Sequence, residues 1–246
     1  MRVAIISDIH SNLEALTAVV ADLQERKPER IWCLGDIAGY NADPDRCCEI
    51  VRDLCHVTVM GNHDGAVTEY VEPSHFNRVA KEAVMWDRRV MKRGNVEFLK
   101  SLRSAAAIDE EVLLVHGSPS DPDKYILAGK IAKEEIEFMK KTLKREIGFF
   151  GHTHFPVVYE LTGNGTFNTH LGKGTIQLKK GFFHLINPGS VGQPRDGDPR
   201  ASYVLFNREK REVEFIRIEY DIKSCQEKII SAGLPPFLAD RLSHGY

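Results

Sequence analysis

The sequence predicts an α/β protein, and three observations support this prediction. Short apolar runs alternate with helical patterns over the first 150 residues, which is typical of a mainly parallel sheet with connecting helices. After Phe155, five short apolar runs follow one another without helices between them, which favours antiparallel pairing. The chain of 246 residues is 42% hydrophobic and 28% charged, so it can bury a sizeable core without a disulfide or a metal.

Each element of the first part has a local reason. Arg2 to Ser7 is an apolar run typical of a buried strand. The run Ser11-Asn12-Leu13-Glu14 fits a capping box and predicts a helix that ends near Lys27. Asp43-Pro44 places an N-cap residue before a proline, which predicts a helix ending near Leu54. Other predicted helices cover 75–102 and 132–144, and other predicted strands cover 31–34, 57–60, 112–115 and 147–150.

The second part predicts antiparallel strands that form a second sheet or extend the first. Glycines punctuate its turns, and a last helical segment begins at Asp221 and is interrupted by Gly233-Leu234-Pro235-Pro236. This interruption begins a Leu-Pro-Pro-Phe-Leu-Ala stretch that either covers the site or makes a dimer contact. No repeat or linker divides the chain, so we expect one domain over 1–246. The predicted strands cover 157–161, 175–178, 182–186, 201–206 and 213–218, and the turn glycines are Gly163, Gly165, Gly172 and Gly181.

Composition excludes several classes of protein. The 33 Lys and Arg nearly balance the 35 Asp and Glu, so the net charge of −2 gives no reason to expect non-specific binding to nucleic acid or membranes. No apolar stretch approaches the length of a membrane span or a secretory signal, and we expect a cytoplasmic protein. The five cysteines are odd in number and lack a CxxC spacing, which argues against disulfides and a thiolate zinc site. Neither a P-loop nor a GxGxxG motif is present.

Five loops that each follow a predicted strand carry groups able to bind metals. Because the carboxyl ends of parallel strands open onto one edge of a sheet, these loops are expected to meet at one site. Together they hold three Asp, one Asn and five His, a set that suits divalent transition ions. The glycines beside them permit close backbone approach. The five runs are Asp8-Ile9-His10, Gly35-Asp36, Gly61-Asn62-His63-Asp64, His116-Gly117 and Gly151-His152-Thr153-His154.

In this order the five runs resemble the calcineurin-like metallophosphoesterase superfamily, whose pattern is DxH, GD, GNH[DE], H and GHxH. The stretch Asn187 to Arg195 extends the resemblance to a compact bacterial and archaeal branch described as phosphodiesterases or as diadenosine-tetraphosphatase-like. The resemblance implies a four-layer α-β-β-α sandwich of two mixed sheets with flanking helices.

The resemblance also implies two divalent metal ions about 3.5–4 Å apart. Manganese is favoured, and iron, zinc, nickel, cobalt or magnesium also suit such donors. Asp36 would bridge the ions through its two carboxylate oxygens, while the neutral amide of Asn62 would limit the charge of the site. One ion would be held by Asp8, His10, Asp36 and His154, and the other by Asp36, Asn62, His116 and His152.

The implied reaction is phosphoester hydrolysis by in-line attack of a metal-bridging hydroxide. His63 would donate a proton to the leaving group, and Asp64 would orient His63. Arg195 is a candidate phosphate clamp beside a second arginine, Arg200, in the same turn. Tyr40 is a candidate stacking residue.

The leading interpretation is a phosphodiesterase or phosphatase acting on a small phosphoester or a nucleotide-type substrate. The segment after Gly35-Asp36 lacks the arginine that protein phosphatases and diadenosine-tetraphosphatases carry there, which disfavours the first class and weakens the second. A dinucleoside-polyphosphate or nucleotide hydrolase is the first alternative, and a catalytically silent metal-binding scaffold is the second. The oligomeric state is open, with a homodimer as one option.

Overall fold

The computed structural model describes residues 1–246 and contains two mixed sheets of six strands each. The first sheet has the order β3-β2-β1-β11-β12-β9. Strands β1, β2 and β3 run parallel, and β11, β12 and β9 continue the sheet in antiparallel pairs. The strands are β1 (Arg2–Ile6), β2 (Arg30–Cys33), β3 (Val57–Thr58), β9 (Gly174–Gln177), β11 (Ala201–Asn207) and β12 (Glu212–Ile218).

The second sheet has the order β4-β5-β6-β10-β7-β8. Strands β5, β6 and β10 are parallel, while β4, β7 and β8 pair antiparallel with their neighbours. The strands are β4 (Ala105–Ala107), β5 (Val112–Val115), β6 (Ile147–Phe149), β7 (Val157–Leu161), β8 (Phe167–Leu171) and β10 (Phe183–Asn187).

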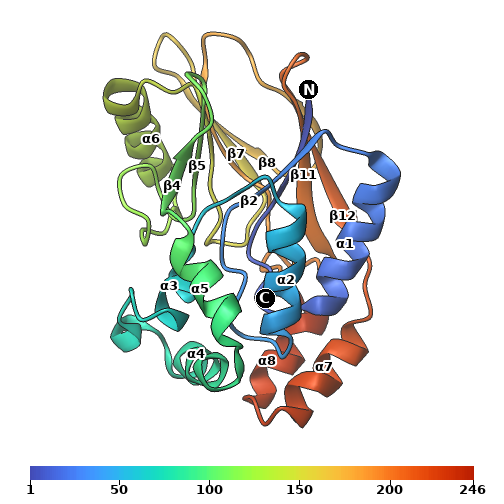
Figure 1. Cartoon of the computed structure of the whole chain (residues 1–246). Helices are drawn as coiled ribbons and strands as arrows, with labels where there is room; N and C mark the ends of the chain where they lie inside the picture. The colour runs from blue at the N-terminus through green and yellow to red at the C-terminus, as the bar shows by residue number, and fades with distance from the viewer.

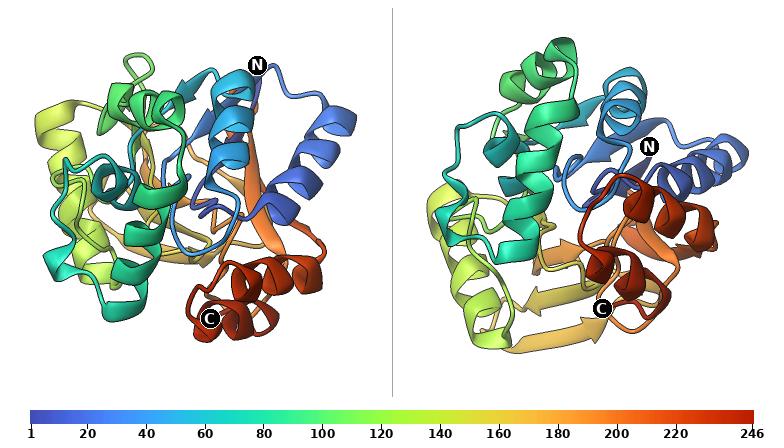
Figure 2. Two further views of the ribbon diagram at one scale, coloured as in Figure 1. Left: turned by 60° about the horizontal axis from the view of Figure 1, so that its bottom comes forward. Right: turned by 90° about the horizontal axis from the view of Figure 1, so that it is seen from below.

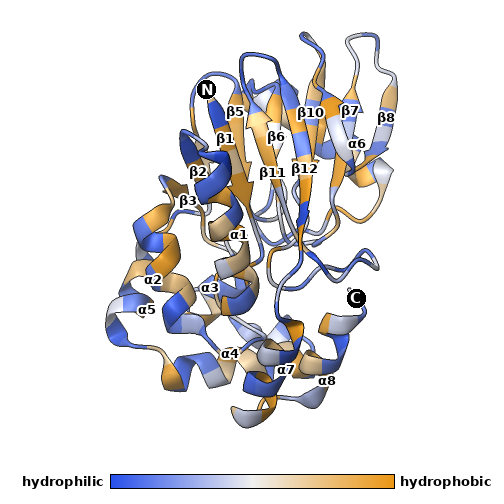
Figure 3. Cartoon of the chain, turned by 90° about the vertical axis from the view of Figure 1, so that its right-hand side faces the viewer, coloured by the Kyte–Doolittle hydropathy of each residue, from blue (hydrophilic) through white to orange (hydrophobic).

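Side-chain alternation along the strands produces the four layers (Figure 1). Val3 and Ile5 of β1 face the second sheet and pack in one cluster with Phe149 of β6. Ala4 and Ile6 face the other way, into a cluster that includes residues of the covering helices. Both faces of β1 are therefore buried, as its continuous apolar run predicts. Figure 3 shows hydrophobic segments on the strands of both sheets and on the helices that cover them.

Helices cover the outer faces of both sheets. The first sheet is covered mainly by α1 (Leu13–Arg26), α2 (Pro44–Leu54) and α5 (Arg93–Ser101). The second is covered by α6 (Gly129–Phe138) and the π-helical turn η2 (Met139–Leu143). The remaining elements are α3 (Asn62–Val67), η1 (Pro73–His75), α4 (Arg78–Val90), α7 (Ile222–Ser231), α8 (Pro236–Asp240) and η3 (Arg241–Ser243).

The C-terminal helices form a separate apolar cluster at one end of the molecule (Figure 2). Ile229 of α7, Leu238 of α8 and Leu242 of η3 pack with Ala83 of α4 and with Tyr40. The C-terminal segment therefore lies beside the loop that follows β2. No helix combines the length and apolarity that a membrane crossing requires.

The predicted sandwich and most element positions are confirmed, with several differences. The parallel strands of the first part are divided between two sheets instead of forming one, and the later antiparallel strands extend both. The predicted helix over 75–102 is broken at Met91, where the backbone is extended. Strands β4 and β8 were not predicted, because an alanine run and a largely exposed polar edge carry no strand periodicity.

The predicted capping box at Ser11 is also wrong. Asn12 is the N-cap of α1, and its side-chain oxygen accepts a hydrogen bond from the Ala15 amide at 3.0 Å. Ser11 has a φ of +57°, its amide donates to the Ile37 carbonyl, and its hydroxyl has no hydrogen-bond partner, so it does not cap the helix.

Candidate metal centre

The seven predicted metal ligands lie together where the two sheets meet at the carboxyl ends of their parallel strands. Each side chain lies in the loop after a strand, or at the start of the helix that follows that loop, so the strand end sets its approximate position. All seven are buried, none more than 8% exposed. The first sheet supplies Asp8 and His10 after β1, Asp36 after β2 and Asn62 after β3, and the second supplies His116 after β5 and His152 and His154 after β6.

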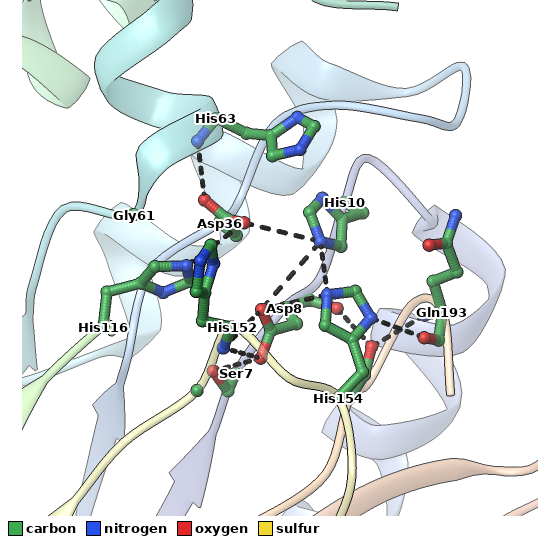
Figure 4. A network of polar contacts seen from close by, with 12 residues as sticks. Ser7, Asp8, His10, Asp36, Gly61, His63, His116, His152, His154 and Gln193 are labelled. Atoms are coloured by element: carbon green, nitrogen blue, oxygen red, sulfur yellow. Dashed lines mark hydrogen bonds and ion pairs between the residues drawn. The ribbon is translucent and has the colours of Figure 1, made fainter. Parts of the chain in front are cut away.

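These donors form two groups, and a third group of His10, Asp36 and His63 shares one member with each of them (Figure 4). In the first, His154 Nε2 lies 3.3 Å from Asp8 Oδ1 and 3.1 Å from His10 Nε2. In the second, His116 Nε2 lies 3.2 Å from Asp36 Oδ2. The same oxygen of Asp36 lies 3.6 Å from His10 Nε2, so Asp36 stands between the groups.

Asn62 and His152 complete the second group. The Asn62 side-chain oxygen lies 3.2 Å from His116 Nε2. His152 has donor atoms close to those of Asp36 and His116, and its Nε2 is buried without a hydrogen-bond partner. The structure thus gathers all seven residues that the sequence predicts.

The histidine tautomers are set by backbone carbonyls. Nδ1 of His10 donates to Ala38 O at 3.0 Å, and Nδ1 of His154 donates to Gln193 O at 2.6 Å. Each Nε2 therefore carries a lone pair, and the two lone pairs face each other across 3.1 Å. Two facing lone pairs repel unless a cation lies against them. These residues accordingly fit a bound metal ion, with outer partners of the kind that orient metal-binding histidines.

The charges of the site agree with this fit. Burial lowers the pKa of His10 and His154, and burial with the positive charge of His116 lowers the pKa of His152 to about 3. These imidazoles therefore stay neutral, as metal ligands must. Burial opposes ionisation of Asp36, but the charge of His116 holds its pKa well below the usual range. Against the effect of burial, Asp36 in turn raises the pKa of His116 to about 10, so without a metal His116 carries a proton that a bound cation would have to displace.

The backbone around the donors is strained. Five of the seven candidate ligands have a positive φ, a conformation that residues other than glycine seldom adopt. Such residues persist where the surrounding structure fixes them, and they cluster at functional sites. The five are Asp8 (φ +54°), His10 (+48°), Asp36 (+53°), His152 (+67°) and His154 (+59°).

Two glycines make room for this arrangement. A Cβ on Gly61 would lie 2.0 Å from Asp36 Oδ1, and a Cβ on Gly39 would lie 2.4 Å from His63 Nδ1. Gly39 also has a φ of +97°. Both positions therefore require glycine because a side chain would collide with its neighbours. Gly39 also requires it because of its positive φ.

His63 faces a cavity beside the donors. Its ring packs against His10, Tyr40 and Phe76 at centroid distances of 4.9, 4.5 and 4.8 Å. Its Nδ1 has no hydrogen-bond partner, and burial lowers the pKa of His63 to about 4. The side chain is thus a neutral imidazole held in place by packing.

The prediction that Asp64 orients His63 is wrong. The Asp64 carboxylate accepts hydrogen bonds from the amides of Ile37 and Ala38 at 2.9 and 3.1 Å, and from Gly61 at 3.0 Å. Neighbouring residues on a helix point in different directions, which is why Asp64 turns away from His63. Asp64 therefore ties the loop after β2 to the loop after β3. Burial and the charge of Asp36 raise the pKa of Asp64 to about 7.

The cavity has a volume of about 350 Å³ and an aromatic wall. Tyr40, Phe76 and Tyr125 line it together with Asn62, His63 and His152. The ring of Tyr125 lies 3.6 Å from that of His152 and is 43% exposed, so it offers an open aromatic face. Sequence reasoning missed Tyr125, because nothing in its local sequence marks a residue of the site.

Tyr40 and Arg195 lie at the site, while Arg200 does not. The Tyr40 ring is only 6% exposed and packs 4.6 Å from the His10 ring, so it supports its neighbours and has no free face for stacking. The Arg195 guanidinium lies 5.7 Å from the centre of that ring and donates to Gln193 Oε1. Arg200 pairs instead with Asp198.

Residues 1–211 match the model of the calcineurin-like phosphoesterase superfamily domain. This chain belongs to that superfamily. The clusters of histidine and aspartate and the family together indicate divalent metal binding, and the chain is a metal-dependent phosphoesterase.

Similar chains and folds extend over the whole length. The uncharacterized protein MJ0912 of Methanocaldococcus jannaschii is 40% identical over 99% of this chain and 98% of its own. A metallophosphoesterase from Sphaerobacter thermophilus has a TM-score of 0.86 and 38% identity, covering 100% of this chain and 99% of that one. The hypothetical protein PH1004 of Pyrococcus horikoshii OT3 shares the fold, with a TM-score of 0.79, 19% identity and coverage of 100% and 98%.

Proposed function

We propose that this phosphoesterase binds two divalent cations and hydrolyses phosphodiesters of small molecules. Asp8, His10 and His154 would hold one cation, and Asn62, His116 and His152 would hold the other. Asp36 would bind both. The observation that carries this proposal is the position of Asp36, whose Oδ2 lies within 3.6 Å of His10 Nε2 and 3.2 Å of His116 Nε2.

The residues of the site have different chemical roles. When bound, divalent cations supply Lewis acidity, which lowers the pKa of water and screens phosphoryl oxygens. The two buried carboxylates, Asp8 and Asp36, balance part of the cationic charge. Asn62 contributes a neutral oxygen, which leaves the site net positive toward a phosphate. The carbonyls that accept from the histidine Nδ1 atoms keep each imidazole aimed inward.

His63 would act at the leaving group. Its ring borders the aromatic cavity, while its Nδ1 is buried against Gly39 without a hydrogen-bond partner. A leaving oxygen that enters the cavity would meet this imidazole, which donates a hydrogen bond or a proton to it. The volume of about 350 Å³ accommodates an organic leaving group, and this favours an organic phosphoester over inorganic pyrophosphate.

Manganese is our proposed metal. The donors combine carboxylate and amide oxygens with imidazole nitrogens, a mixture that suits borderline divalent ions and offers no thiolate for softer ones. None of the five cysteines belongs to a donor group, and all five are free thiols.

Hydrolysis of bis-p-nitrophenyl phosphate by metal-stripped protein, with and without manganese, tests the function. We expect manganese-dependent release of p-nitrophenol. Changes to groups that only support metal ligands lower metal affinity or activity 10- to 100-fold. We therefore expect Asp36→Asn, a change to a ligand itself, to lower activity at least about 100-fold. Asp53→Asn, on an exposed carboxylate, is the matched control and should retain full activity.

The same assay separates the enzyme from a silent scaffold. A protein that binds two manganese ions and releases no product from mono- or diester substrates would be a scaffold, and the proposed activity would be wrong. Full activity of Asp36→Asn would contradict the shared-carboxylate arrangement. The position of His63 at the cavity supports turnover over the scaffold alternative.

A further inference from the structure

The cavity beside the metal centre has a wall that carries negative charge. Glu72, just before η1, and Asp123, in the loop after β5, both line it, and no lysine or arginine is among its lining residues. Burial and the charge of Asp121 raise the pKa of Asp123, so a positive charge placed beside this carboxylate would stabilise its ionised form. The wall therefore favours a positively charged occupant.

The basic side chains near these two carboxylates are engaged elsewhere. Arg78 and Lys124, the nearest ones in the sequence, pair with other glutamates. Arg195 packs over the Tyr40 ring, 5.7 Å from its centre, and donates to the side chain of Gln193. No arginine or lysine of the protein thus neutralises the two carboxylates of the cavity wall.

Aromatic rings line the same cavity. Tyr125 and Phe76 both form part of its wall. The Tyr125 ring lies against the His152 ring and is still 43% exposed, and the Phe76 ring packs 4.8 Å from that of His63. The face of an aromatic ring attracts cations, and quaternary ammonium groups are commonly held by such rings. Rings and carboxylates together are the features that recognise an organic ammonium group.

The cavity also borders the reacting groups directly. His63 and His152 belong to its wall and are 4% and 3% exposed, and Nε2 of His152 is buried without a hydrogen-bond partner. A phosphoryl group at the metal donors would therefore place its organic group in this cavity. A second phosphate in the same place would meet two carboxylates with no basic residue to balance the charges, which disfavours it.

We propose that the cavity binds a positively charged ammonium group of the leaving alcohol, between the rings of Tyr125 and Phe76 and the carboxylates of Glu72 and Asp123. The inference rests on the proposed function and narrows its substrate to a phosphodiester of an amino alcohol. In the reaction, the oxygen of water bonds to phosphorus as the bond from phosphorus to the alcohol oxygen breaks. The alcohol oxygen keeps the electron pair of that bond and takes one proton of the water, and a phosphate monoester is left.

Binding of choline and of 3,3-dimethylbutanol to the full-length protein, with and without manganese, tests the site by calorimetry. The two alcohols have the same shape, but carbon replaces the charged nitrogen in the second. We expect choline to bind about 3- to 30-fold more tightly. Glu72→Gln, Asp123→Asn and Tyr125→Leu should each lower this ratio at least about twofold, while Asp53→Asn, an exposed carboxylate elsewhere, should keep it.

The three variants lie on separate parts of the wall, and each of the three side chains is exposed. A folding defect in one therefore leaves the other two decisive. Equal Kd values for the two alcohols in the wild type, or an unchanged ratio in all the variants that fold, would overturn the proposal.

Turnover of the two methyl phosphodiesters of these alcohols provides the second readout. Both release methyl phosphate, which phosphorus NMR measures, and we expect kcat/KM to be about 3- to 30-fold higher for the choline diester. Hydrolysis of bis-p-nitrophenyl phosphate without this preference would overturn the inference and leave the proposed function standing. A wild-type protein that hydrolyses none of the three diesters would refute the proposed function, and the calorimetric comparison would still decide whether the cavity selects a cation.

Discussion

Removal of the Asp64 carboxylate is expected to unfold the link between two loops of the metal centre. Asp64 Oδ1 accepts from the amides of Ile37 and Ala38, and Oδ2 accepts from the amide of Gly61. All three bonds are buried, and the acceptor is fully enclosed. If this side chain is changed, the backbone N–H groups lose their acceptor, and water cannot replace it because the groups are buried.

The size of the effect follows from the number of bonds lost. Asp64→Asn keeps one oxygen and thus two of the three bonds, but turns an NH2 group toward the Gly61 amide. One buried unpaired donor costs about 1–3 kcal/mol. Asp64→Ala leaves three unpaired donors and is expected to cost at least about 3 kcal/mol, a large part of the 5–15 kcal/mol by which a typical domain is stable.

Urea unfolding of the metal-stripped protein measures these costs without a contribution from bound metal. The urea concentration at the midpoint should decrease from the wild type to Asp64→Asn and again to Asp64→Ala, while the slope of the free energy against urea stays the same. Asp53→Asn, on the exposed surface, should stay within about 0.5 kcal/mol of the wild type.

A double-mutant cycle decides what Asp64 acts through. Because the Asp64 oxygens bond backbone amides and His63 is held by ring packing, Asp64→Ala and His63→Ala should be additive within about 0.5 kcal/mol. A coupling of 1 kcal/mol or more would show that the carboxylate supports His63. An Asp64→Asn variant as stable as the wild type would refute the account of the three amides.

Three further predictions concern other parts of the molecule. His63→Ala should keep its metal content while turnover falls about 10²–10⁴-fold, most for poor leaving groups, and equal losses on good and poor leaving groups would remove His63 from the leaving-group role. Burial lowers the pKa of His184 to about 4, below its unfolded value near 6.5, so protonation favours the unfolded chain and stability is lost as pH falls between these values. As the pH is lowered over this range, the wild type should lose up to about 3 kcal/mol more unfolding free energy than His184→Leu. Urea titrations at several pH values measure this, and equal losses in the two proteins would contradict it. Asn12→Ala should lower the unfolding free energy by about 1 kcal/mol, and a smaller loss in Asn12→Ala than in Ser11→Ala would contradict the assignment of the cap.

The donor set was predictable because each donor follows a strand. The carboxyl ends of parallel strands lie along one edge of a sheet, so residues just after them meet there. Strands β5 and β7 begin and end as the apolar runs predict. His116 and Asp36 are 80 positions apart in the chain but 3.2 Å apart in space, which follows from their strand-end positions.

Other features depend on contacts that a local pattern does not contain. The division of the parallel strands between two sheets depends on which strands pair, and both arrangements bury the same apolar runs. The orientation of Asp64 depends on three amides from two loops. Tyr125 reaches the site through a loop whose own sequence carries no periodic signal.

The number of manganese ions bound per chain tests the central claim most directly. Equilibrium dialysis of metal-stripped protein, followed by elemental analysis, measures it without a substrate. The account predicts two ions per chain in the wild type and in Asp53→Asn, and a weakened affinity for both ions in Asp36→Asn, because Asp36 stands between the two donor groups. One ion per wild-type chain, or two equally tight ions in Asp36→Asn, would contradict it.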